Sequence, residues 1–243
     1  MAEGPPGPRP RQGVLEDLQG GQYTSCYCEE NVYHLCTQLC PSGSPEETAA
    51  PEAFAVFISS AGKAVPIWRQ KLGEDDSSPV IWDYHVILLV WDEEHRPFVV
   101  DYDTTLEPSA GPGIPAKDYV ECSLLPGLEV PGPLQPLLRV VPAAVLAREF
   151  ASDRSHMKKP NGAWQATPPP GPCIRGSAAA APMNLDEWRV MDHGCSLPCS
   201  PGELAGRRRG QVLTLPGFIK FILQSTSIES HSHRQNGLGL RLT

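Results

Sequence analysis

The sequence lacks the features that mark several classes of protein. Among its 243 residues, 28 acidic side chains outnumber 20 basic ones, and the formal net charge of -8 provides no electrostatic surface for nucleic acid. The one basic run, Arg207 to Arg209, has no aromatic residues interleaved with it. No stretch approaches the roughly 20 apolar residues of a membrane span, and no apolar signal segment begins the chain. We therefore expect an intracellular protein that binds neither nucleic acid nor membrane.

A disulfide framework is also not expected, although the chain has eight cysteines. Such frameworks are typical of short secreted chains, whereas this chain is long, has no export signal and spaces its cysteines irregularly. Reduced thiols are the expectation, which leaves cysteines free to act as nucleophiles or metal ligands. A zinc module built from Cys26, Cys28, Cys36 and Cys40 is the weaker alternative, because their spacing lacks the paired knuckles of structural zinc sites.

Proline is abundant, with 27 residues that cluster in a few segments, while the apolar fraction of 40% is sufficient for one globular core. We expect one domain with loose insertions. The predicted divisions are a disordered arm over 1–21, a catalytic domain over 22–225 with proline-rich loops at 107–136 and 160–172, an insertion at 193–210, and an irregular tail over 226–243.

The order of the predicted elements indicates an α+β fold. After Cys28, apolar residues at helical spacing predict a helix of about three turns that ends near Pro41. Two hairpins are expected next, one formed by 54–59 with 64–68 and one by 80–91 with 97–103. A strand over 137–141 and helices after Pro142 and near the C-terminus complete an antiparallel sheet flanked by helices.

Cys28 lies where a helix begins, and Thr24 or Ser25 could cap that helix. Unpaired N–H groups and the helix dipole would stabilise a thiolate there and lower its pKa. His85 interrupts an apolar strand and is the best candidate base. With the second hairpin centred on 93–94, His85 pairs with about residue 102, so Asp101 should lie within reach of the imidazole. The chain order Cys, His, Asp is that of papain-like thiol enzymes.

The sequence motifs around these residues are more specific than the order of the three residues. In sequence order the motifs are SCYCEEN (25–31), AVFIS (55–59), PIW (66–68), PVIWDYHV (79–86), DYDT (101–104), FASDRSHMK (150–158), PPPGPCI (168–174) and MNL (183–185), with a weaker similarity at VLTLPGF (212–218). These blocks closely resemble the protein N-terminal glutamine amidohydrolase family. The match runs from about Tyr23 to Leu185.

The resemblance implies a papain- and transglutaminase-like core whose catalytic residues are Cys28, His85 and Asp101. It implies a monomeric enzyme of the cytosol and nucleus that uses no cofactor and acts on proteins or peptides with N-terminal glutamine. The product, N-terminal glutamate, would feed the arginylation branch of the N-degron pathway. By the chemistry of a thiolate and an amide, Cys28 attacks the carboxamide, His85 protonates the departing ammonia, and water hydrolyses the thioester.

Recognition of a chain terminus requires a group that binds the free α-ammonium. Glu29, Glu30 and Asp83 are candidates by proximity, and Ser152 and Asp153 belong to a polar stretch with the character of a functional loop. Two other functions remain open on the sequence: acyl transfer to an amine in place of water, and non-catalytic binding of N-termini. We also expect that Cys26 can be replaced with part of the activity retained.

Overall fold

A computed structural model describes residues 13–18, 20–41, 52–191, 194, 197–198, 204 and 209–224. Its centre is a six-stranded sheet with the order β10-β7-β1-β4-β5-β6, and each neighbouring pair is antiparallel. The strands are β1 (Ala53–Ser59), β4 (His85–Trp91), β5 (Pro97–Val100), β6 (Ile114–Pro115), β7 (Leu137–Pro142) and β10 (Gln211–Thr214). The predicted α+β class with an antiparallel sheet is confirmed.

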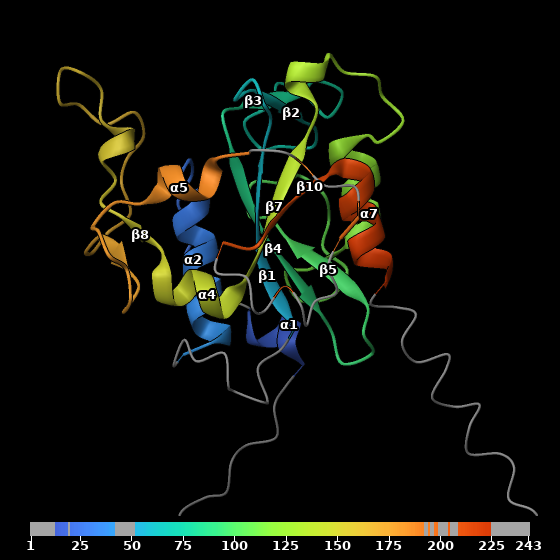
Figure 1. The fold of residues 1–243 in the computed structure, drawn as a ribbon, viewed down its shortest axis with the longest axis horizontal. Helices are drawn as coiled ribbons and strands as arrows, with labels where there is room; N and C mark the ends of the chain where they lie inside the picture. Colours follow the sequence, from blue (N-terminus) through green and yellow to red (C-terminus); the bar gives the residue numbers. More distant parts are fainter. Residues whose placement is uncertain are drawn as a thin grey trace, which may run out of the picture.

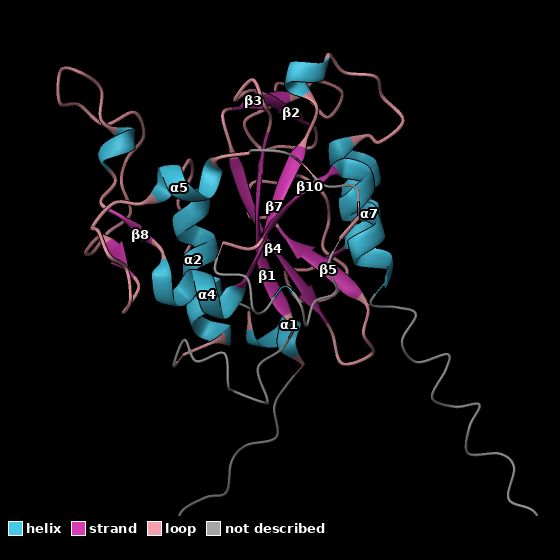
Figure 2. Cartoon of the chain, viewed as in Figure 1, coloured by secondary structure: helices cyan, strands magenta, loops and turns pink. Residues whose placement is uncertain are grey.

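Helices cover both faces of this sheet (Figures 1 and 2). One face carries α1 (Val14–Asp17), α2 (Cys28–Leu39), α4 (Ala143–Glu149) and α5 (Leu185–Arg189). The other carries α3 (Ala116–Tyr119), which continues into a π-helical turn at Val120–Leu124, and α7 (Leu215–Gln224). The result is a three-layer arrangement in which the sheet is the middle layer.

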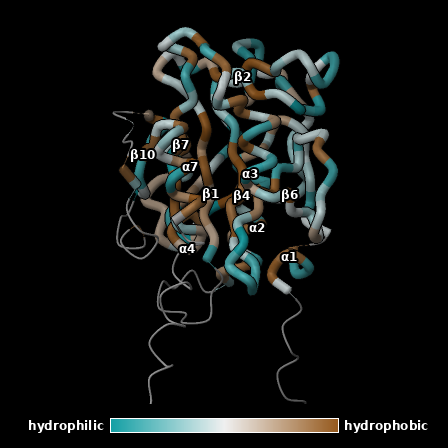
Figure 3. The backbone as a smooth tube through the Cα atoms, turned by 90° about the vertical axis from the view of Figure 1, so that its right-hand side faces the viewer, coloured by the Kyte–Doolittle hydropathy of each residue, from teal (hydrophilic) through white to brown (hydrophobic). Residues whose placement is uncertain are grey.

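The apolar run of β4 is continuous because both faces of the strand are buried. Successive side chains of a strand point to opposite faces. Val86, Leu88 and Val90 accordingly pack in the core on the α2 face. Ile87, Leu89 and Trp91 pack in the core on the α7 face, and Figure 3 shows hydrophobic residues along β1 and β4 in the middle of the molecule. The two sides of one strand thus anchor both outer layers.

The first predicted hairpin is wrong. β1 is bonded on its two edges to β4 and β7, so it has no free edge for the following segment. That segment forms β2 (Val65–Ile67), which pairs instead with β3 (Val80–Trp82) in a separate small sheet. The predicted strand over 80–91 is therefore divided at Asp83 and Tyr84, and His85 begins β4 instead of lying in mid-strand.

Two segments expected to be loose contribute to the core. Val14, Leu15 and Leu18 are buried, so the disordered arm predicted over 1–21 is wrong for residues 13–18. The proline-rich segment 107–136 holds β6, α3 and the π-helical turn, because its apolar residues cover the sheet and offset its loop-forming composition. Most of the predicted insertion at 193–210 and the tail over 226–243 lie outside the described residues.

Near the C-terminus, the segment expected to be helical begins as strand β10 before α7. The residues of α7 thus confirm part of that prediction. Two short strands, β8 (Ala151–Ser152) and β9 (Ile174–Arg175), pair with each other beside α2 and α4. None of the helices within the described ranges is long and apolar enough to cross a membrane.

Candidate active site

Cys28 is the first residue of α2, as the sequence predicts. The preceding turn is held by Asn31, whose side chain accepts the N–H of Thr24 and donates to its carbonyl at 2.9 Å each. The helix has no side-chain cap; its N-cap residue is Tyr27, so the expected cap by Thr24 or Ser25 is wrong. Cys26 has φ 67°, a left-handed conformation, at the point where the chain turns into the helix.

His85 and Asp101 are in direct contact. The imidazole Nε2–H donates to Oδ1 of Asp101 at 2.9 Å, and both side chains are buried. The register of β4 and β5 brings them together, because Leu88 lies opposite Val100 and Asp101 follows directly. The second ring nitrogen of His85, Nδ1, is buried without a hydrogen-bond partner among the described residues. Asp101 thus orients the histidine through one ring nitrogen, and the other nitrogen makes no hydrogen bond within the described structure.

Each oxygen of Asp101 accepts two hydrogen bonds. Besides the imidazole, Oδ1 accepts the backbone N–H of Asp103 at 2.9 Å. Oδ2 accepts the side-chain amide of Gln70 at 3.1 Å and the hydroxyl of Tyr119 at 2.9 Å. Burial alone would favour the neutral acid, but His85 and these donors hold the pKa of Asp101 below its usual value. Asp101 is therefore a fixed, ionised partner of the histidine.

The pKa values of His85 and Cys28 are both raised, but for different physical reasons. Burial lowers the pKa of His85, but the charge and hydrogen bond of Asp101 outweigh it and raise that pKa above the usual value. The pKa of the Cys28 thiol is raised well above its usual value, first by burial and then by the charges of Glu29 and Asp103, while a hydrogen bond from the backbone of Val86 lowers it. The lowered thiol pKa that we predicted from the helix start is wrong, because burial exceeds the effect of the helix dipole.

A pocket of about 700 Å³ opens beside Cys28. Tyr84 and His156 line it with the cysteine, and Asp83 and Arg189 also belong to its wall. Trp82, another wall residue, stacks on the His85 ring with centroids 5.2 Å apart and planes at 22°. The sulfur thus faces space for a small ligand, while the indole shields the histidine.

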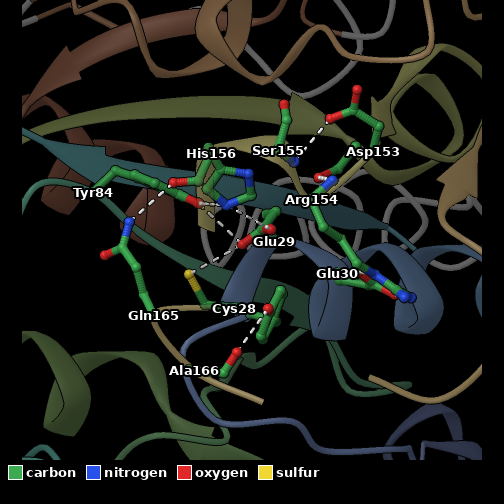
Figure 4. A network of polar contacts seen from close by, with 12 residues as sticks. Cys28, Glu29, Glu30, Tyr84, Asp153, Arg154, Ser155, His156, Gln165 and Ala166 are labelled. Atoms are coloured by element: carbon green, nitrogen blue, oxygen red, sulfur yellow. Dashed lines mark hydrogen bonds and ion pairs between the residues drawn. The ribbon is translucent and has the colours of Figure 1, made fainter. Parts of the chain in front are cut away.

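The five residues predicted to bind substrate do not gather at one place, and Figure 4 shows three of them, Glu29, Glu30 and Asp153. The carboxylate of Glu29 lies 3.9 Å from the Cys28 sulfur. Glu30 is held by the Arg154 guanidinium, and the Asp83 side chain is 63% exposed at the pocket wall.

The other two of these residues have local structural roles. Ser152 is buried in β8, where its hydroxyl accepts the backbone N–H of Arg154 at 3.3 Å. Asp153 accepts the N–H of Ser155. Glu29 is therefore the predicted carboxylate that the fold places beside the thiol.

The sequence did not predict four polar residues that contact Asp101 or Glu29. Gln70 and Tyr119 bind Asp101, and Tyr84 and His156 contact Glu29. The last of these lies within the SDRSH stretch, whose polar density was a signal. Tyr119 had no such signal, because it lies in a segment expected to be a loop.

A metal cluster built from cysteines is not formed by the described residues. The ligand atoms that do come within 4.8 Å of one another belong to His85, Asp101 and Asp103. Their proximity is explained by hydrogen bonds, since Asp101 accepts both the imidazole N–H and the N–H of Asp103. Cys26, Cys28 and Cys36 are free thiols.

A buried thiol at a helix start, a histidine bound to an ionised aspartate and an adjoining pocket are the elements of a thiol hydrolase site. Comparison with known proteins identifies the family. The model of the N-terminal glutamine amidase family matches residues 23–222. The chain belongs to this family.

Curated relatives named protein N-terminal glutamine amidohydrolase support the assignment. The zebrafish (Danio rerio) protein is 40% identical over 202 residues, which cover 82% of this chain and 87% of that protein. The Arabidopsis thaliana protein is 43% identical over 65% of this chain and 70% of its own length. The human protein is 38% identical over 70% of this chain and 78% of its own length.

Proposed function

We propose that this protein deamidates N-terminal glutamine of proteins and peptides to glutamate, releasing ammonia through a thioester on Cys28. The observation that carries the proposal is the state of His85. Asp101 holds its Nε2, while its Nδ1 is buried and unpartnered within the described structure. The next residue, Val86, hydrogen-bonds the Cys28 sulfur through its backbone. Family membership and the names of the relatives supply the substrate.

The proposed reaction begins with proton transfer. Cys28 gives its proton to Nδ1 of His85, and the sulfur forms a bond to the carboxamide carbon of the substrate. Backbone N–H groups at the start of α2 stabilise the resulting oxyanion, because the first N–H groups of a helix have no intrahelical partner. The His85 imidazolium, stabilised by Asp101, then protonates the amide nitrogen, the carbon–nitrogen bond breaks, and ammonia leaves.

Hydrolysis of the thioester completes the proposed cycle. His85, now neutral, removes a proton from water as the water oxygen attacks the thioester carbon. The carbon–sulfur bond breaks, the sulfur recovers a proton, and glutamate remains at the N-terminus. The raised pKa of Cys28 is consistent with a thiol that ionises when substrate enters, with His85 as the acceptor.

Several further features of the proposal come from family resemblance. The core is papain- and transglutaminase-like, and the monomeric protein works without a cofactor in the cytosol and nucleus. Its product, N-terminal glutamate, enters the arginylation branch of the N-degron pathway.

Mass spectrometry of defined peptides tests the reaction. Peptides that begin with Gln, begin with Asn, or carry Gln only internally are incubated with the wild type and with Cys28→Ala. We expect conversion of N-terminal Gln alone, with a mass increase for NH2 replaced by OH, and complete loss in Cys28→Ala. Cys26→Ala is the matched control, for which we expect partial activity. Conversion that survives the loss of Cys28 would contradict the mechanism.

An added amine distinguishes hydrolysis from acyl transfer. If water resolves the thioester, ammonia and free glutamate appear in equal amounts even when a primary amine is present. Incorporation of the amine into the peptide would instead establish transfer. Tight binding of Gln-initiated peptides without ammonia release would favour a non-catalytic N-terminus binder.

A further inference from the structure

We propose that Glu29 is the receptor for the α-ammonium group of the substrate and that His156 covers it until substrate enters. This inference rests on the proposed function, since it assigns the group that makes the site selective for a chain terminus. Three side chains that line the pocket surround the Glu29 carboxylate, namely Cys28, Tyr84 and His156 (Figure 4).

The two oxygens of Glu29 have different surroundings. Oε2 accepts the hydroxyl of Tyr84 at 3.1 Å and lies 3.9 Å from the sulfur of Cys28. Oε1 is buried and accepts no hydrogen bond from any described residue. Nε2 of His156 lies 3.4 Å away, outside hydrogen-bonding geometry, and burial lowers the pKa of this imidazole, which favours its neutral form. A buried carboxylate oxygen without a donor is costly, and a ligand ammonium would supply the missing donor.

The position of Glu29 suits the length of the substrate. In glutamine, two methylene groups and the α-carbon separate the attacked carboxamide carbon from the α-nitrogen. The receptor must therefore lie close to the sulfur, and the Glu29 carboxylate does, because its Oε2 is 3.9 Å from that atom. The unpartnered oxygen explains why N-terminal glutamine is selected over internal glutamine, because an internal glutamine has no free α-ammonium group.

The other carboxylates near the pocket are less suited to this role. Both oxygens of Glu30 are bound by the Arg154 guanidinium, at 3.0 and 2.5 Å, and the pair is buried. The Asp83 side chain is largely exposed and pairs with Arg189 at 3.4 Å. A solvated carboxylate contributes little to binding a cation, whereas a desolvated one contributes much more.

His156 is placed to uncover Glu29 by turning its ring. Its Nδ1 has no hydrogen-bond partner in the described structure, and its Nε2 meets the Tyr84 hydroxyl at 3.3 Å. The backbone beside it is fixed, because the Arg154 guanidinium binds Glu30 and the carbonyls of Pro169, Gly171 and Pro172. Rotation of one side chain would thus admit the ammonium without movement of the loop.

The test compares two substrates on two proteins. One peptide begins with glutamine, and the other begins with the same residue lacking its α-amino group. Glu29→Gln preserves size and the acceptor for Tyr84 but removes the charge. We expect kcat/KM of this variant to fall at least about 30-fold for the glutamine peptide, as for truncation of a buried charge pair. The des-amino peptide should change less than about threefold, which also shows that the variant is folded.

Asp83→Asn is the matched control. It should alter the two peptides by the same factor, because it removes a carboxylate of the same pocket that the proposal does not use. Equal losses on both peptides in Glu29→Gln would mean that Glu29 acts on the thiol, and no loss on either would mean that it has no role. Either result overturns the receptor.

Binding separates this proposal from the proposed function. In a Cys28→Ala background, calorimetry should show the glutamine peptide binding more tightly than the des-amino peptide, and Glu29→Gln should remove that difference. If the difference is lost although the wild type releases no ammonia, the receptor stands and the proposed reaction fails. If the difference persists in Glu29→Gln, the receptor fails whatever the activity.

Discussion

Asp101 and Glu29 are both buried carboxylates at the same site, but their surroundings are opposite. Asp101 has both oxygens fully occupied by donors, and its pKa is lowered. Glu29 has one oxygen without a hydrogen bond among the described residues, and burial raises its pKa to about 7. A saturated carboxylate orients a neighbour permanently, whereas an unsaturated one has capacity left for a ligand. We call Asp101 and its hydrogen-bond donors the fixed side of the site, and Glu29 the receptive side.

Asp101→Asn gives the largest effect expected on the fixed side. The amide removes the charge that raises the pKa of His85 and can present an N–H to the imidazole, which favours the wrong tautomer. We expect kcat to fall about 10⁴-fold, by analogy with the same change in a Ser-His-Asp triad, while KM changes little. Stopped assays of ammonia release measure both constants.

Asp118→Asn provides the control for Asp101→Asn. Asp118 is exposed on α3, next to Tyr119, and its replacement should leave kcat unchanged. A loss of less than tenfold in Asp101→Asn would show that the saturated carboxylate is structural, and the contrast between the two sides would no longer concern catalysis.

Tyr119→Phe is expected to have a smaller effect on the same side. It removes one donor to Oδ2 of Asp101 but leaves Gln70 and the contact with His85. Loss of one hydrogen bond to a buried charge is worth about 1.5 kcal/mol, so kcat should fall about tenfold. Because Tyr119 acts only through Asp101, KM should stay constant, and the pH profile of kcat/KM should shift with the pKa of His85.

Tyr102→Phe is the matched control for Tyr119→Phe. The Tyr102 hydroxyl is buried but makes no hydrogen bond within the described structure. Its removal should therefore leave kcat and the pH profile unchanged. Equal effects of the two substitutions would mean that the hydroxyl of Tyr119 does not support Asp101.

The sequence predicted the fixed side more completely than the receptive one. The hairpin centred on 93–94 placed His85 opposite about 102, and the observed pairing of Leu88 with Val100 shifts that estimate by one residue. The error did not matter, because β5 ends at Val100 and Asp101 is free to turn toward the imidazole. Local patterns suffice where two partners belong to adjacent strands.

The receptive side depends on packing that local patterns do not contain. Glu29 and Glu30 are consecutive and chemically identical, and the sequence made both candidates by proximity alone; the distant Arg154 neutralises one and leaves the other open. The predicted pKa of Cys28 failed for a related reason. A helix start can be recognised in a sequence, but burial and the charges of Glu29 and Asp103 arise only from the fold.

Glu29→Gln should also change how stability depends on pH. In the unfolded chain this carboxyl titrates near its usual value of 4.5, and in the fold near 7. Between these values the folded state binds more protons, so the free energy of unfolding falls as pH rises. The difference corresponds to about 3 kcal/mol, lost by pH 8. The substituted amide does not titrate, so the stability of the variant relative to the wild type should rise by about 2.5 kcal/mol between pH 5 and pH 8.

Urea unfolding at pH 5, 6, 7 and 8 measures this gain, and Glu74→Gln, an exposed substitution, corrects for the removal of a charge alone. If the difference in unfolding free energy between the variant and the wild type grows through pH 6 and 7, the pKa of Glu29 is raised in the folded protein without substrate. Ionisation of Glu29 then destabilises the fold. Ligand binding would then reverse that cost, since an ammonium stabilises the carboxylate. A constant difference would mean that Glu29 is already ionised and paired in the empty protein, which would make it a second saturated carboxylate like Asp101.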